Sequence, residues 1–221
     1  MSIRENVEAL LKEIPDNVTI VAAAKTRTAE EITEAVSAGI SVIGENYIKD
    51  LKKVYSEVKV KAEWHYIGTL QKNNIRRNIL EMLDMIETID SYEIAEMVNN
   101  KCQAIDKVMP VLIEVNSAKE SQKGGVMPEA VIDTVKKIST LSNVKIMGLM
   151  TMGPYWASAE ELKKYFHLTK NIFEEIKKLN LSNVEMKYLS MGMSDSYREA
   201  IEEGANIVRI GTKIFGPRNY D

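Results

Sequence analysis

Short apolar runs alternate with amphipathic segments along almost the whole chain. The runs lie near 18–24, 40–43, 63–67, 85–89, 108–115, 144–149, 184–189 and 206–210. The segments between them carry helix signals, among them the capping-box spacing of Thr28 with Glu31 and of Ser158 with Glu161. The pattern therefore predicts eight strands, each followed by a helix.

One further helix is predicted before the first run and ends at Pro15, because apolar residues recur there at helical spacing: Ile3, Val7, Leu10, Leu11 and Ile14. An eightfold alternation of strand and helix is compatible with a doubly wound sheet or with a closed TIM barrel. The number of strands and the even composition favour the barrel. We therefore predict an α/β fold in which residues 1–221 form a single (β/α)8 barrel domain with an extra N-terminal helix.

The composition narrows the function classes. The chain has 221 residues, of which 45% are hydrophobic and 28% charged, and its formal net charge is −3 with the basic residues scattered. This predicts a soluble protein that does not bind nucleic acid. Charged residues interrupt the N-terminal region and no segment is apolar for long enough to span a bilayer, while Cys102 is the only cysteine. We expect a cytoplasmic monomer in which that thiol is structural.

Lys25 is the first candidate for chemistry. It follows directly on the apolar run 18–24, which contains three alanines. An amine at the tip of a buried strand is partly desolvated, and in its neutral form it can make a Schiff base with an aldehyde. In a barrel, the first and eighth strands are neighbours, so Lys25 should lie beside the turn that follows the eighth strand.

The ends of the seventh and eighth strands predict a phosphate site. TIM barrels often bind phosphate with the loops after these strands, through backbone amides and small polar residues. The candidates are Ser190, Met191 and Ser194 after the seventh strand, with Gly211 and Thr212 after the eighth. Ser194 or the next residue suits equally well the N-cap of a helix over 195–203. An aldehyde site beside a phosphate site suggests pyridoxal phosphate.

Three further polar residues occur at or near strand ends. Arg209 lies within the eighth strand near the barrel mouth, where an unpaired guanidinium would be unfavourable and a pyridine nitrogen would offer it an acceptor. Arginine keeps its proton, so it would leave that nitrogen unprotonated and the ring a poor electron sink. Asn46 is a candidate hydrogen-bond donor to the cofactor. His65 suits an acid–base role, although we favour a hydrogen-bonded structural histidine. No cluster of residues indicates a metal.

Over nearly its whole length the chain resembles the pyridoxal phosphate homeostasis protein family, also described as alanine-racemase N-terminal-domain-like barrel proteins. The resemblance rests on the order of these motifs: Ala23-Ala24-Lys25-Thr26, Gly44-Glu45-Asn46-Tyr47, His65-Tyr66-Ile67-Gly68 with Leu70-Gln71 and Asn73, Gly148-Leu149-Met150, Leu189-Ser190-Met191-Gly192-Met193-Ser194 and Val208-Arg209-Ile210-Gly211-Thr212 with Ile214-Phe215-Gly216. It implies a barrel that carries pyridoxal 5'-phosphate as a Schiff base on Lys25, with Arg209 near the pyridine nitrogen and Ser190, Gly211 and Thr212 near the phosphate.

The resemblance also has departures. Ala24 stands where serine is usual, Asn74 where lysine is usual, and Ser196 where a second aspartate is common. The missing lysine at position 74 puts in doubt a role of that position in cofactor exchange, but leaves the Schiff-base site intact.

These observations predict a pyridoxal-phosphate-binding protein of intracellular cofactor homeostasis, without catalytic turnover, which hands the cofactor to apo-enzymes that depend on it. The main alternative is a pyridoxal-phosphate-dependent amino-acid racemase. Two-base racemisation needs an acid–base group on each face of the substrate, and in the related racemases the second comes from an additional domain. A third possibility is an aldolase that uses Lys25 on a sugar phosphate without a cofactor.

Overall fold

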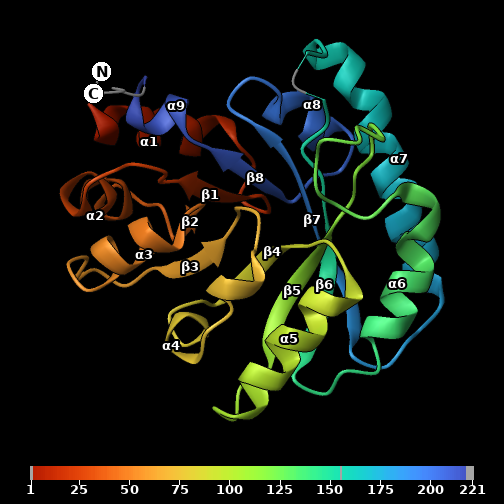
Figure 1. The fold of residues 1–221 in the computed structure, drawn as a ribbon. Coiled ribbons are helices and arrows are strands. Elements are labelled where there is room, and N and C mark those ends of the chain that lie inside the picture. Colours follow the sequence, from red (N-terminus) through yellow and green to blue (C-terminus); the bar gives the residue numbers. More distant parts are fainter. Residues whose placement is uncertain (1, 155, 218–221) are drawn as a thin grey trace.

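The chain folds as a closed barrel of parallel strands with helices around it (Figure 1), as the sequence predicts. The computed structural model describes residues 2–154 and 156–217. All eight predicted strands are present within these ranges: β1 (Thr19–Ala23), β2 (Val42–Glu45), β3 (Glu63–Tyr66), β4 (Met85–Ile89), β5 (Met109–Glu114), β6 (Val144–Met150), β7 (Val184–Met193) and β8 (Ile207–Ile210).

The barrel closes between its first and last strands. β1 pairs with β2 on one side and with β8 on the other, and the β1–β8 register places Val21 opposite Arg209 and Ala22 opposite Ile210. We call the end of the barrel where the strands finish the barrel mouth. The closure brings Lys25 and the turn after β8 to the same side of this mouth, as expected.

Helices follow every strand, and one further helix precedes β1. The helices are α1 (Ile3–Glu13), α2 (Ala29–Ser37), α3 (Ile48–Tyr55), α4 (Arg77–Leu80), α5 (Tyr92–Gln103), α6 (Val131–Ile138), α7 (Ala159–Lys178), α8 (Tyr197–Glu202) and α9 (Thr212–Phe215), with short 3-10 turns at Lys72–Asn74 and Pro128–Ala130. The extra helix α1 lies beside α2 and α9 (Figure 1). Because α9 is short, α1 covers the outer side of the barrel at the first and last strands. No helix within the described ranges could cross a membrane.

Alternation along the strands produces two cores. Outward-facing residues form the large core against the helices, and it includes the fully buried Ile32, Leu51 and Phe166. Inward-facing residues fill the barrel with two small apolar clusters, one around Val21 and one around Leu112. The rest of the interior includes polar side chains that are also buried: His65, Glu87, Ser190 and Arg209.

Candidate functional site

Lys25 lies just beyond the end of β1, on the sharp turn that leads to α2. The next residue, Thr26, has a left-handed backbone with φ of 66°, which is unfavourable for a β-branched side chain. Its N–H donates to Asp50 Oδ2 of α3 at 3.4 Å. Backbone strain of this kind is characteristic of functional sites, because the surrounding structure has to maintain it.

The amine of Lys25 has no carboxylate partner among the described residues. The side chain is half-buried, and Nζ lies 4.8 Å from the centre of the Tyr47 ring. A lysine at a barrel mouth, without an ion pair and against an aromatic face, is accessible to an electrophile.

Ser194 and Gly211 form a polar cradle next to the end of β1, the strand that leads to Lys25. The Gly211 N–H donates to Ser194 Oγ at 3.3 Å, and the Lys213 N–H donates to the same oxygen at 3.4 Å. Ala23 of β1 is adjacent, because a Cβ added to Gly211 would lie 3.4 Å from its carbonyl oxygen. Thr212 follows as an exposed residue at the start of α9.

The alternative role of Ser194 as a helix N-cap is wrong. The helix α8 begins at Tyr197, and its N-cap is Ser196, which makes no side-chain capping bond. Ser196 Oγ instead accepts from the N–H of Met193. The Asp195 alternative fails for the same reason, and Ser194 is left facing the amides after β8.

The two other candidates on β7 lie deeper than expected. Ser190 is fully buried in the barrel interior, where its hydroxyl donates to Glu87 Oε2 at 2.6 Å. Met191, the next residue along the strand, faces the opposite way and is fully buried in the large core. The side chains of both residues are therefore occupied within the protein.

The guanidinium of Arg209 is paired within the protein itself, so it does not depend on a pyridine nitrogen for an acceptor. Nη1 donates to Ser190 Oγ at 2.6 Å and Nη2 donates to the carbonyl oxygen of Thr151 at 2.9 Å. Burial lowers the pKa of Arg209, and the carboxylates of Glu87 and Glu114 oppose that effect. These two hydrogen bonds engage two of the five guanidinium N–H donors, which leaves the others for a ligand.

His65 has the structural role that we favoured. It is buried, and its Nδ1 lies 2.7 Å from Glu87 Oε1. Glu87 was not among the sequence candidates, although a glutamate within the apolar run 85–89 was a visible signal. It links β3 to β7 and stands 3.9 Å from the Arg209 guanidinium.

Two acidic residues lie at the mouth on the side of β4 and β5. Burial, followed by the charge of Asp90, raises the pKa of Glu114 to about 7, and Arg209 opposes the shift. Both carboxylates flank Gly124, whose added Cβ would lie 3.7 Å from Asp90 Oδ2 and 4.0 Å from Glu114 Oε2.

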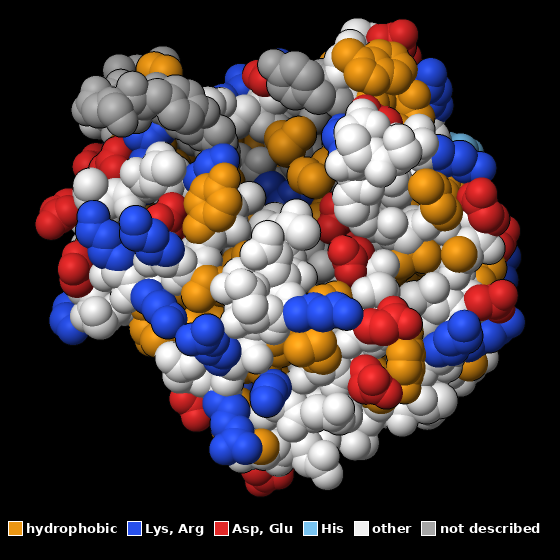
Figure 2. Space-filling view, viewed as in Figure 1, with side chains coloured by type: hydrophobic (Ala, Val, Ile, Leu, Met, Phe, Trp, Pro, Cys, Tyr) orange, Lys and Arg blue, Asp and Glu red, His pale blue; other side chains and the backbone are white. Residues whose placement is uncertain are grey.

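Figure 2 shows a hollow on the face near β7 and β8, with Lys or Arg atoms in its depth and hydrophobic side chains along its border.

Asn46 is half-buried and lies directly after β2, between Glu45 and Tyr47. Tyr47 carries the ring under Lys25. Glu45 is fully buried on the helix side of the strand, and neither of its carboxylate oxygens has a hydrogen-bond partner within the described part of the chain. Burial, with the charge of Asp50 second, raises the pKa of Glu45 to about 8.

Replacing Glu45 by glutamine should therefore stabilise the protein in a pH-dependent way. The folded state keeps the proton of Glu45 up to about pH 8, whereas the unfolded chain loses it near 4.5. Wild-type stability should fall between these values, by at most about 1.4 kcal/mol per pH unit. In urea unfolding, the advantage of Glu45→Gln should be smallest below pH 4.5, grow as the pH rises, and become constant above 8. An advantage that does not change with pH would contradict this.

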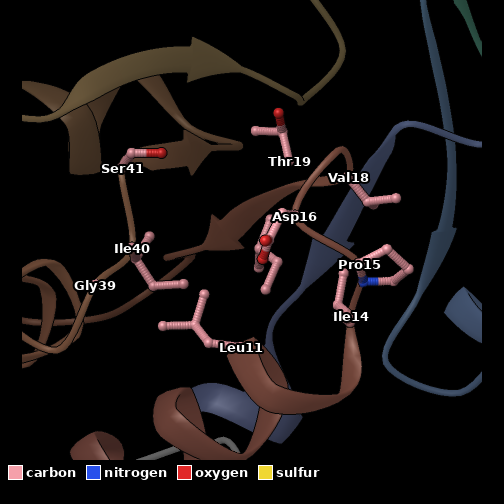
Figure 3. A pocket seen from close by; sticks show the side chains of 10 residues that line it. Leu11, Ile14, Pro15, Asp16, Val18, Thr19, Gly39, Ile40 and Ser41 are labelled. Carbon is pink, nitrogen blue, oxygen red and sulfur yellow. The ribbon is translucent and has the colours of Figure 1, made fainter.

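Other potential sites lie away from this mouth. Cys102 is fully buried, and burial raises the pKa of its thiol to about 11, as expected for a structural cysteine. His167 lies on α7 with its Nδ1 3.2 Å from Glu203. A cavity between the end of α1 and the starts of β1 and β2 is lined by residues that include Leu11, Thr19 and Ile40 (Figure 3). It belongs to the end of the barrel opposite Lys25.

Sequence comparison relates the chain to a family model and to several named proteins. Residues 1–219 match the family model described as alanine racemase, N-terminal domain. The pyridoxal phosphate homeostasis protein of Aquifex aeolicus is 38% identical, with 91% of this chain and 87% of that protein covered. The human protein of the same name is 35% identical, with coverages of 91% and 77%.

Solved structures of similar proteins have the same barrel fold. PipY of Synechococcus elongatus PCC7942 is similar with a TM-score of 0.91 without PLP and 0.89 with PLP bound. The sequence identity is 28%, and 97% of this chain and 100% of that chain are covered in both cases. An alanine racemase of Clostridium difficile shares the fold at a TM-score of 0.81 and 12% identity, with all of this chain but only 57% of the racemase covered.

Proposed function

Because the chain belongs to the alanine racemase N-terminal domain family and, within it, to the pyridoxal phosphate homeostasis proteins, we propose that it binds pyridoxal 5'-phosphate at the barrel mouth and holds it for transfer. One observation carries the proposal. The pairing of β1 with β8 joins an amine from one end of the sequence to a guanidinium and a cradle of amides from the other.

The chemical character of these groups fits the cofactor. Pyridoxal phosphate supplies an aldehyde that reacts reversibly with amines, on a ring with an acceptor nitrogen and a phosphate. Among the described residues, the amine of Lys25 has no carboxylate partner, and Arg209 uses two of its five N–H donors. Ser194 offers its hydroxyl hydrogen, and the amides of Gly211 and Lys213, which donate to Ser194 Oγ at 3.3 Å and 3.4 Å, would donate to the phosphate in its place.

Each residue has a distinct role in this proposal. Lys25 binds the cofactor covalently as a Schiff base, and the strained turn at Thr26 orients it. The Tyr47 ring excludes water from one side of the Lys25 amine. Asn46, in the same turn after β2, donates a hydrogen bond to the cofactor. Arg209 donates to the ring nitrogen. Gly211, Thr212 and Ser194 receive the phosphate, whereas the contribution of Ser190 passes through Arg209 and that of Met191 is limited to its backbone.

Ser194→Ala should weaken binding of pyridoxal phosphate by about tenfold and leave that of dephosphorylated pyridoxal nearly unchanged. A hydrogen bond to a charged group contributes roughly 1.5–3 kcal/mol, and only the phosphate form has this charge. Dissociation constants measured by absorbance titration test the difference.

Ser196→Ala is a suitable control, because this neighbouring serine is equally buried but its hydroxyl accepts from Met193 within the same turn. If Ser194→Ala weakened both ligands equally, the phosphate would have to be bound elsewhere.

We further propose that the protein is a carrier without turnover, whose recipients are apo-enzymes that require the cofactor. The names of the matched relatives, which refer to homeostasis, support this proposal. In the proposed arrangement, a permanently charged Arg209 at the ring nitrogen would also disfavour carbanion chemistry. A racemase is the competing function within the same family.

Proton exchange distinguishes the two functions. With L-alanine in deuterated water, we expect the pyridoxal-phosphate-loaded protein to exchange the α-proton no faster than free pyridoxal phosphate does. Rapid exchange that requires Lys25, together with accumulation of D-alanine, would replace the carrier by the racemase. The proposal that apo-enzymes receive the cofactor is tested by transfer to an apo-transaminase, measured as recovered transaminase activity.

A further inference from the structure

A chain of hydrogen bonds crosses the barrel interior and ends at Arg209. His65 Nδ1 lies 2.7 Å from Glu87 Oε1, Ser190 Oγ donates to Glu87 Oε2 at 2.6 Å, and Arg209 Nη1 donates to Ser190 Oγ at 2.6 Å. The four residues come from β3, β4, β7 and β8, and each is at most 5% exposed. None of them except Arg209 is part of the proposed cofactor contacts.

The direction of every bond in this chain is fixed by Glu87. Burial alone would raise the pKa of Glu87, but the hydrogen bond and charge of His65, the charge of Arg209 and the hydroxyl of Ser190 outweigh it and lower the pKa. An ionised carboxylate only accepts, so His65 Nδ1 and the Ser190 hydroxyl both donate to it. The lone pairs of Ser190 are then directed to Arg209, which can only donate.

Such a network is unfavourable unless every member is satisfied, and apolar residues of similar volume often serve stability better. The same interior is apolar elsewhere, around Val21 and around Leu112. Core stability therefore does not explain why four polar side chains converge here. This series of hydrogen bonds has one effect outside the interior: it fixes the position of the Arg209 guanidinium at the barrel mouth.

We propose that Glu87, oriented by His65 and acting through Ser190, is a positioning residue that holds Arg209 where it donates to the ring nitrogen of the cofactor. The inference rests on the proposed function. Two carboxylates attract Arg209: Glu87 beneath it and Glu114 at the end of β5. Without the anchor at Ser190, the guanidinium keeps only its bond to Thr151 and turns toward Glu114, away from the ring.

The ring nitrogen gives a direct readout of this role. The probes are pyridoxal 5'-phosphate and its 1-deaza analogue, in which a C–H replaces the ring nitrogen. The wild-type protein, stripped and reconstituted, should bind pyridoxal phosphate at least about tenfold more tightly than the analogue, because the analogue leaves a fixed donor of Arg209 unpaired. In Glu87→Gln and in Ser190→Ala this preference should fall to about threefold or less.

Controls separate positioning from general destabilisation. Thr169→Val also removes a buried hydroxyl, one that donates to Tyr165 within α7, and it should keep the wild-type preference even if it lowers stability. Arg209→Gln should remove the preference altogether. Where Glu87→Gln does not fold, Ser190→Ala carries the test, since it removes a single hydroxyl.

The outcomes are distinct. If Glu87→Gln and Ser190→Ala bind pyridoxal phosphate and retain the wild-type preference, Glu87 is structural only and the inference is wrong. A wild-type protein that binds both probes equally also overturns the inference, while the cofactor assignment stands. A wild-type protein that binds neither probe overturns the proposed function itself.

Discussion

Lys25→Ala should abolish covalent attachment of pyridoxal phosphate while leaving the barrel folded. The Schiff base requires an amine at this position, and alanine has none. The side chain is half-buried and makes no ion pair among the described residues, so its loss removes little packing. After borohydride reduction, the wild-type protein should gain the mass of one cofactor on the peptide that contains Lys25 and lose its visible absorbance band. The variant should show neither change.

Lys187→Ala is the matched control, because Lys187 Nζ also lies 4.8 Å from a tyrosine ring, that of Tyr188, but in the N-terminal half of β7, away from the barrel mouth. It should be labelled like the wild type. Covalent labelling of Lys25→Ala at the wild-type level would assign the bond to another lysine and remove the main support for the proposed site.

The architecture was predictable because parallel barrel strands are buried on both faces and so appear as continuous apolar runs. The strand ends were less visible. β7 extends to Met193, beyond the expected end at 189, through Ser190 and Gly192, which carry no apolar signal. Gly192 has φ of 88° and Gly148 on the neighbouring strand has φ of 151°, values that glycine adopts readily. Irregular backbone of this kind cannot be derived from periodicity.

The site was only partly predictable, for a related reason. Lys25 and Gly211 were found because each stands next to a strand end, and neighbouring strands bring them together. Glu87 was missed, because it joins β3 and β4 to β7 and β8 across the barrel interior, and contacts across the interior between such distant strands are not apparent from the sequence. The direction of side chains also mattered: alternation turns Ser190 into the barrel, whereas Ser194, beyond the strand, contacts the backbone amide of Gly211.

Gly68→Ala should greatly reduce both stability and binding of pyridoxal phosphate. A Cβ at this position would lie 2.1 Å from the carbonyl oxygen of Asn46 and 2.7 Å from its carbonyl carbon, which are backbone atoms that cannot turn aside. The buried Gly68 is itself held by Thr88, whose hydroxyl donates to its carbonyl oxygen at 2.6 Å. The segment of Asn46 and Tyr47 must therefore move. Overpacking of this kind destabilises by roughly 1–3 kcal/mol or more.

The displaced segment contains the ring that lies beside Lys25, so the loss should extend to the cofactor: we expect at least about a tenfold weaker affinity, since 1.4 kcal/mol corresponds to a factor of ten. Gly124→Ala is the control, because the nearest described atom beyond its chain neighbours, Asp90 Oδ2, would lie 3.7 Å from the added Cβ. It should change the free energy of unfolding by less than about 1 kcal/mol. Urea unfolding and absorbance titration of both variants give the comparison. If Gly68→Ala were destabilised but bound the cofactor as tightly as the wild type, the turn after β2 would have no part in the site, and Asn46 would be removed from it.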